Sequence, residues 1–424
     1  MQLTSFKALA LAAALLQTPA SGAPVVEGHA APAASHGLPV VYTTTTSHGQ
    51  VVDWVKPESQ GRLAKTPGAP PPHSRISKIM TTGGGGPTGH GRGVTPRMEQ
   101  LLRDPEMKGP AGTVPILRTA GRPTLPPKRL PHSEDNGAGI ASSSSSGNGS
   151  DSNIHPRSYA GTHWYASSNQ YVDSRGGMAT FSLFSPFTQR GSDFSLMQTA
   201  VVRGGAPHAG TGPKDQTVEA GWIAYPDQVS GTHLFAYYTT NGYSADGDNV
   251  GGWNRDHAGW VQVDSAIYPG VAFAPLSVDG GTQYEMEICY QLIDGNWWLW
   301  VLDRWVGYYP GGLFAAGGVN AADTLAGHSD RIHFYGEIYN SEDDMTTTDM
   351  GSGQFAEAGW THSAYQHNIV YYDLNTKPYD YDAGNLFVIS DPNRYSLVSH
   401  FKSGSEWGSY MYLGGPGAGG VIGG

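Results

Sequence analysis

From Tyr159 onward the sequence consists of short runs in which apolar and polar residues alternate. The runs are rich in Val, Ile, Tyr, Phe, Trp and Thr, and turn sequences such as Asn241-Gly242 and Asp294–Asn296 separate them. A period of two is typical of β-strands, and pairs containing Gly and Asn are typical of tight turns. Helical periodicity is weak everywhere except around Leu313–Leu325. The pattern predicts an all-β fold, a sandwich or barrel of many short strands.

The first part of the chain has a different composition. Residues 1–156 hold 19 of the 29 prolines, one of the 11 tryptophans and a net charge of +5, whereas residues 157–424 carry a net charge of −16. A proline-rich segment with few aromatic residues cannot easily bury a core of its own. The opposite charges favour docking of the first part on the second, although a basic tail without a docking role would have the same composition. The strongly acidic second part argues against nucleic-acid binding.

The extreme N-terminus has the pattern of a secretory signal. Lys7 supplies a positive charge, Ala8–Leu16 is a short apolar run, and the small residues Ala20–Ala23 form a cleavage region. We therefore expect residues 1–23 to be a signal peptide and the mature protein to be secreted, extracellular and monomeric. No later apolar run has the length needed to span a membrane, so no membrane association is expected.

Composition also predicts the remaining domain boundaries. Residues 24–135 are rich in Pro and Gly, and residues 136–156 form a Ser/Gly-rich linker. Residues 157–424 form the β domain. Within the linker, Asn148 begins an Asn-Gly-Ser sequence and is a candidate glycosylation site.

Two glutamates lie in short strand-like runs, each close to a glycine. They are Glu219 in Thr217–Trp222 and Glu337 in His333–Tyr339. Two carboxyl groups facing one cleft would suffice for acid–base catalysis, and a nearby glycine leaves room for another backbone. Ordinary solvated strand glutamates would show the same alternation.

Other chemistry has little support. Cys289 lies on an alternating strand without a neighbouring base, which indicates an inert packed thiol. Ser352 lies in Gly-Ser-Gly rather than in the Gly-x-Ser-x-Gly sequence of serine hydrolases. The histidines show no metal-binding spacing, so neither a metal nor a cofactor is expected. The cluster Trp297–Trp305 is typical of an aromatic core, although exposed tryptophans also bind sugars or proline rings.

Several short motifs occur together in a shared order between Gly177 and Asp373. They are Asp193–Leu196, Thr217–Trp222, His233–Thr239, Gly259–Gln262, Gly295–Leu299, Val306–Pro310, Gly336–Ile338 and Met350–Gly353. In this order they resemble the neprosin family, secreted glutamic peptidases with a preceding activation peptide. The loop Asp246–Asn254 lacks the cysteine of the plant members, and residues 24–135 show little likeness to the family's activation peptide.

The resemblance implies an antiparallel, concanavalin- or jelly-roll-like β-sandwich with Glu219 and Glu337 as catalytic residues in a groove on one sheet. One carboxylate activates water and the other stabilises the developing oxyanion; we favour Glu337 as the base, with the reverse assignment open. The resemblance also implies activity in acid and cleavage next to proline in a polypeptide substrate. It further implies inhibition by the chain's own pro-region, for which residues 24–135 are the candidate. The candidates for binding the substrate are Trp222, Trp298, Tyr335 and Tyr339.

Two rival functions use the same residue types. Paired carboxylates and tryptophans on a β-sandwich also occur in glycoside hydrolases. A non-catalytic module that binds carbohydrates or surfaces would need the tryptophans and not the glutamates.

Overall fold

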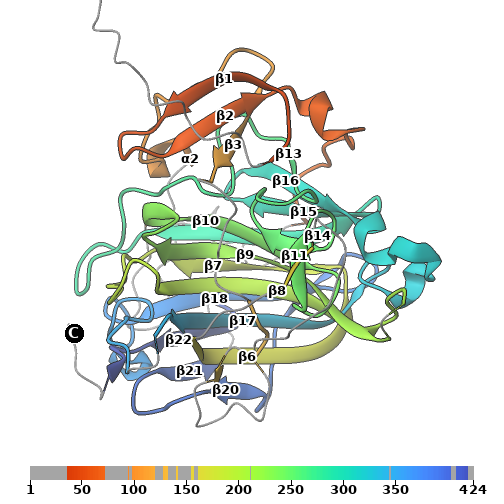
Figure 1. Cartoon of the computed structure of the whole chain (residues 1–424). Helices are drawn as coiled ribbons and strands as arrows, with labels where there is room; N and C mark the ends of the chain where they lie inside the picture. The colour runs from red at the N-terminus through yellow and green to blue at the C-terminus, as the bar shows by residue number, and fades with distance from the viewer. Residues whose placement is uncertain are drawn as a thin grey trace, which may run out of the picture. The chain divides into compact units, whose positions relative to one another are not determined.

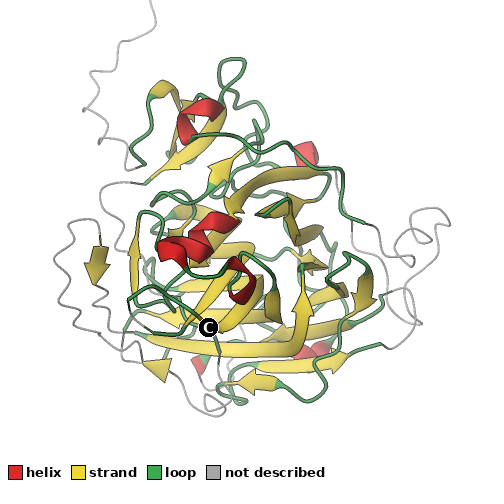
Figure 2. Cartoon of the chain, turned by 90° about the vertical axis from the view of Figure 1, so that its right-hand side faces the viewer, coloured by secondary structure: helices red, strands yellow, loops and turns green. Residues whose placement is uncertain are grey.

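The computed structural model has two large antiparallel sheets that face each other, which confirms the predicted all-β sandwich (Figures 1 and 2). The structure describes residues 36–71, 94, 98–119, 128–131, 140–141, 154–156, 161–210, 212–342, 345–402 and 407–418. Helical turns in these residues are short: η1 Pro57–Gln60, α2 Met98–Leu101, η3 Gly311–Gly318, η4 Ala321–Asp323 and η5 Ala356–Ala358. No helix in these ranges is long and apolar enough to cross a membrane.

The first sheet contains ten strands within the described residues. Their order is β20-β6-β17-β8-β9-β10-β12-β11-β5, and β4 pairs with β6. The strands are β4 Ile140–Ala141, β5 Ile154–Pro156, β6 Thr162–Ser174, β8 Phe194–Ala206, β9 Lys214–Tyr225, β10 Val229–Thr239, β11 Ala245–Gly247, β12 Gly251–Trp253, β17 Ser329–Asn340 and β20 Phe387–Ile389.

The second sheet contains nine strands within the same ranges, in the order β13-β16-β15-β14-β7-β18-β22-β21, and β19 pairs with β18. The strands are β7 Gly176–Ser182, β13 Val261–Gln262, β14 Glu285–Ile293, β15 Asn296–Val301, β16 Arg304–Pro310, β18 Ala364–Tyr372, β19 Pro378–Asp380, β21 Ser396–His400 and β22 Tyr410–Gly414. The predicted turn Asp294–Asn296 joins β14 and β15, which pair antiparallel as a hairpin. The predicted helical piece around Leu313–Leu325 is instead two short 3₁₀ helices, η3 and η4.

Alternation along the strands decides which face of the first sheet each residue occupies. In β9 the even residues Val218 and Trp222 belong to the apolar core between the sheets, and in β17 the even residues Phe334 and Ile338 do so. Since successive side chains point to opposite faces, the odd residues of both strands lie on the other face of the sheet.

The N-terminal part is folded against this core. Strands β1 Val40–Thr45, β2 Val51–Val55 and β3 Val114–Arg118 form a small sheet that the composition did not predict. The buried residues Val52, Trp54 and Leu117 belong to the apolar cluster that fills the space between the two large sheets. The proline-rich part therefore buries its main aromatic residue against the sandwich, because its own sheet is too small to enclose one.

Several carboxyl groups outside the glutamate face are buried. Burial raises the pKa of Asp256 to about 7, even though Thr119 donates a hydrogen bond to it. Burial also raises the pKa of Glu287 to about 7 and that of Asp349 to about 6. At these three carboxyls the folded state binds more protons than the unfolded chain between about pH 4 and 7, so their contribution to the free energy of unfolding falls as the pH rises. The buried His233, whose pKa is lowered to about 4, offsets part of this effect.

We therefore expect the protein to melt at a higher temperature near pH 5.5 than near pH 7.5. Glu287→Gln should reduce that difference, because a glutamine does not ionise, and thermal scans at the two values measure it. The exposed Glu357→Gln is the matched control. Melting that is no higher in acid than at neutral pH would contradict this prediction.

Candidate active site

Glu219 and Glu337 lie on the same face of the first sheet. Glu219 is on β9 and Glu337 on β17, and strand β8 runs between them. Within β8, Ala200 pairs with Glu219 and Leu196 pairs with Glu337, so Gln198 lies between the two glutamates. A β-carbon at the neighbouring Gly221 would meet the Met197 carbonyl oxygen at 1.9 Å, so this position requires glycine where β8 and β9 approach.

The two carboxylates are bridged by one ammonium group. Lys128 Nζ lies 2.5 Å from Glu337 Oε2 and 3.3 Å from Glu219 Oε2, and it donates a 2.9 Å hydrogen bond to Gln198 Oε1. The two glutamate oxygens are therefore no further apart than the sum of the two ion-pair distances, about 5.8 Å. This separation is short enough for one small molecule to contact both.

Four donors fix the orientation of Glu219. Thr217 Oγ1 and the Tyr243 hydroxyl donate to Oε1 at 2.9 and 2.6 Å. Gln198 Nε2 and the Tyr335 hydroxyl donate to Oε2 at 2.9 and 3.3 Å. Burial, and then the charge of Glu219, raise the pKa of the Tyr243 phenol well above its ordinary value, so Tyr243 remains a donor over the physiological pH range.

Glu337 accepts hydrogen bonds from fewer side chains than Glu219 does, and one of its donors is the Lys128 ammonium. His163 Nδ1 on β6 donates to Oε1 at 2.7 Å, and Lys128 donates to Oε2. Burial alone would raise the pKa of Glu337, but the Lys128 ammonium and then His163 outweigh it and hold this pKa below its ordinary value. Glu337 is therefore ionised in this arrangement.

Residues 128–131 cover the site. The Lys128, Glu219 and Glu337 side chains are fully buried. The rings of Phe235 and Trp253 lie 5.7 Å from Lys128 Nζ, and the Tyr335 ring lies 5.6 Å from it, a distance typical of cation–π contacts. A segment of the N-terminal part thus occupies the space between the two carboxylates.

The structure brings two of the four predicted substrate-binding residues to this face. Tyr335 contacts Glu219, and the ring of Tyr339 lies 5.0 Å from that of His163. Trp222 lies on the opposite face of β9, inside the core, and its indole donates to the Ser182 carbonyl. Trp298 packs on Trp305 and Tyr308 in a cluster of the second sheet. Trp222 and Trp298 therefore pack within apolar clusters, whereas the sequence analysis predicted that they bind the substrate. Asn148 lies outside the described residues.

Several residues of the site were not predicted from the sequence, among them Gln198, His163, Lys128 and Tyr243. Gln198 is in a predicted strand, and alternation could have placed it on a common face with Ala200. His163 is on β6, whose Ser- and Asn-rich sequence gave no strand signal. No sequence pattern indicated that Lys128 lies at the site, because its position depends on how the N-terminal part folds over the sheet.

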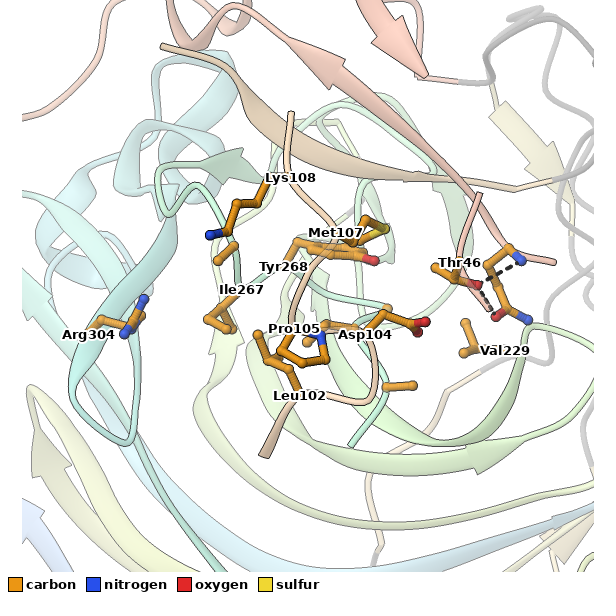
Figure 3. Close-up of a pocket in the computed structure, with 15 residues that line it drawn as sticks. Thr46, Leu102, Asp104, Pro105, Met107, Lys108, Val229, Ile267, Tyr268 and Arg304 are labelled. Carbon is orange, nitrogen blue, oxygen red and sulfur yellow. Dashed lines mark hydrogen bonds between the residues drawn. The ribbon is translucent and has the colours of Figure 1, made fainter. Parts of the chain in front are cut away.

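The described residues also contain a hollow of about 270 Å³ away from the glutamates (Figure 3). The N-terminal part contributes Thr46, Leu102, Asp104 and Lys108 to its lining, and the sandwich contributes residues such as Tyr268. The hollow therefore marks an incompletely packed contact between the two parts. Nowhere in the described ranges do three or more His, Cys, Asp or Glu residues gather as a metal site would require.

A family model described as Neprosin matches residues 191–416, more than half of the chain. The chain belongs to the neprosin family. The matched segment contains Glu219 and Glu337, whereas Lys128 and His163 precede it. Membership of the neprosin family supports peptidase activity.

Solved structures with a related arrangement include scytalido-glutamic peptidase with a transition-state analogue inhibitor. It is 8% identical, covers 59% of this chain and 97% of its own, and gives a TM-score of 0.32. SCP-B, a member of the eqolisin family of peptidases in complex with the tripeptide Ala-Ile-His, is 8% identical, covers 60% of this chain and 97% of its own, and gives a TM-score of 0.28. At these TM-scores we transfer no residue and no activity from either structure to this neprosin-family chain.

Proposed function

We propose that this neprosin-family protein is a secreted, acid-active glutamic endopeptidase that cleaves next to proline and is made as an inactive precursor. The observation that carries the proposal is the bridging of Glu219 and Glu337 by one ammonium group. Once Lys128 leaves, the same space admits a water molecule within reach of both carboxyls.

In the proposed reaction Glu337 is the base. Glu337 takes a proton from the water as its oxygen attacks the scissile carbonyl carbon, and protonated Glu219 donates a hydrogen bond to the oxygen that becomes negative. The tetrahedral intermediate then collapses, the C–N bond breaks, and Glu337 returns its proton to the leaving nitrogen. The hydrogen bond from His163 stabilises the ionised form of Glu337, and four donors do the same for Glu219, so the reverse assignment stays the alternative.

Acid activity follows from the requirement for one proton on the pair. Two carboxylates this close repel each other, so without Lys128 the pair holds one proton at mildly acidic pH and titrates as a unit. Rising pH removes that proton, and activity should fall.

The proposed preference for proline rests on the aromatic rings around Lys128 Nζ. Phe235, Trp253 and Tyr335 surround the space beside the carboxylates. Flat aromatic faces pack well against the compact pyrrolidine ring of proline, as in other sites that bind proline-rich peptides.

Inhibition of the precursor is proposed from the position of Lys128. In this proposal residues 1–23 direct export and residues 24–135 are the pro-region. The ammonium of Lys128 pairs with both carboxylates and occupies the space between them, so it excludes water from that space. Acid would release the pro-region, because protonation of the glutamates removes the ion pairs that hold Lys128.

The test of the proposal is a comparison of substrates with the full-length chain brought from neutral pH to about pH 4, where the pair should hold one proton. We expect cleavage of a peptide with one internal proline, slower cleavage of the same peptide with alanine there, and no action on a panel of polysaccharides. Cleavage of a polysaccharide would indicate a glycoside hydrolase instead. Binding without cleavage of any substrate would indicate a non-catalytic module.

His163 provides a more specific prediction. His163→Leu removes the hydrogen bond to the charged Glu337 and should lower kcat about tenfold or more. It should also move the acid limb of the kcat/KM profile to higher pH, because the ionised form of the base loses a donor. His163→Asn, whose amide nitrogen can replace Nδ1, should retain most of the activity. A pH profile that is identical in the wild type and in His163→Leu would contradict this role.

A further inference from the structure

Three consecutive residues of the N-terminal part are bound in three different ways on the glutamate face. Lys128 extends its side chain to the two carboxylates. The carbonyl oxygen of Arg129 accepts a 3.0 Å hydrogen bond from the Tyr165 hydroxyl. Leu130 is 1% exposed and belongs to an apolar cluster of its own. The side chains of Lys128 and Leu130 therefore enter two separate spaces, and the backbone between them is bound by a hydroxyl group.

The space that holds Leu130 is an apolar pocket on the first sheet. Its lining comes from four strands: Tyr165 on β6, Ala200 and Val202 on β8, Tyr335 on β17 and Val388 on β20. Tyr335 also contacts Glu219, so the pocket adjoins the two carboxylates. Ala200 pairs with Glu219 on β9 and with His333 on β17, so ionisable residues border the apolar cluster on these sides.

We propose that this pocket is a subsite for an aliphatic side chain of the peptide substrate. The inference rests on the proposed peptidase function and adds a second determinant of specificity beside proline. An extended peptide places every second side chain on the same side, which matches the spacing of Lys128 and Leu130. When the pro-region leaves, the apolar space that held Leu130 remains two residues along the bound chain from the position of Lys128 at the carboxylates. An acidic side chain would lose its hydration there and lie near the two carboxylates, so Leu, Ile and Met are preferred and Asp and Glu are rejected.

The experiment uses the full-length chain, self-processed near pH 4, and a peptide mixture with one fixed proline and varied flanking positions. Mass spectrometry of the products reads the residues around each cut. The expected result is enrichment of Leu, Ile and Met over Asp and Glu by about tenfold at one position close to the cut. Cleavage without such enrichment overturns the subsite and leaves the proposed function standing. If no peptide is cleaved, the proposed function fails and the subsite with it.

A compensated variant tests the pocket itself. Val388→Phe fills the pocket from β20, two strands away from the nearer glutamate, and Leu130→Ala removes a comparable volume from the pro-region. The double variant should lose the aliphatic preference and still cleave peptides that carry alanine at that position. Leu130→Ala alone is the matched control and should keep the wild-type preference. If the double variant and Leu130→Ala prefer aliphatic residues equally, the assignment of the pocket as a subsite is overturned.

A second readout is independent of the protein's own activity. Trypsin cuts after Lys128 or Arg129 only when this segment leaves the sheet, so the rate of cutting at neutral pH measures how firmly the segment is held. The Leu130→Asp precursor should be cut about tenfold faster than the wild type, because an ionised side chain is unfavourable in the pocket. Leu130→Ile should match the wild type. A Leu130→Asp precursor that resists trypsin as well as the wild type does overturns the inference.

Discussion

A precursor in which Lys128 is replaced by methionine should shorten itself at a pH about one unit or more above that required by the wild type. The Lys128 ammonium holds the pKa of Glu337 below its ordinary value, so the wild-type pair takes up its proton only in stronger acid. Without the ammonium the two carboxylates repel each other, and the pair takes up a proton at higher pH. The segment is also held less firmly, since breaking a buried ion pair typically costs about 3–5 kcal/mol.

Intact-mass measurements on precursors stepped from neutral pH towards about 4, where one proton per pair is expected, detect this shift. Lys108→Met is the matched control, because Lys108 is an exposed lysine of the same N-terminal part, at the edge of the hollow in Figure 3. The double variant Lys128→Met/Glu337→Gln should stay intact if the cut is the chain's own. The same threshold in Lys128→Met and wild type would show that Lys128 does not control the site.

The second large effect is expected from the glutamates themselves. Glu219→Gln and Glu337→Gln should each lower kcat for a proline peptide by about 10²- to 10⁴-fold, with little change in KM. A glutamine keeps the size and most contacts of the side chain, but it neither accepts a proton from water nor donates one as an acid. Each variant precursor can be opened by wild-type enzyme immobilised on beads, which are then removed before the assay.

Glu287→Gln is the control for this pair, because Glu287 is also a strand glutamate, half-buried on β14 of the second sheet. It should leave kcat unchanged. Near-normal turnover in either Glu219→Gln or Glu337→Gln would exclude a mechanism that needs both carboxyls.

Much of this arrangement is readable from sequence periodicity. Alternation in Thr217–Trp222 and His333–Tyr339 predicts strands, and the odd residues of each strand do share a face. What alternation does not reveal is which face of a strand turns to the core. Trp222 was expected to bind the substrate, although its even position in β9 already places it on the face opposite Glu219, and it packs between the sheets.

Strand β6 shows a different limit. Its central sequence contains Ser167, Ser168 and Asn169, which have low strand propensity, so no strand was expected there. Pairing with β17 on one side and β20 on the other overrides that local preference. His163 comes to the site only through this pairing.

The N-terminal part was the least predictable. Its composition indicates few apolar residues for a core, and the structure indeed buries Trp54 against the sandwich rather than in a separate one. Net charge suggested docking by long-range attraction, whereas the contact at the site is a single buried lysine between two specific carboxylates. Such a contact depends on the course of the backbone over the sheet, and composition carries no information on that course.

The most direct measurement of the central claim compares the masses of two precursors after transfer from neutral pH to about pH 4, where the glutamate pair is expected to hold one proton. The wild type should lose its N-terminal part with time, and Glu337→Gln should keep its full mass under the same conditions. Equal shortening of both chains would contradict the account, because the cut would then owe nothing to the two glutamates.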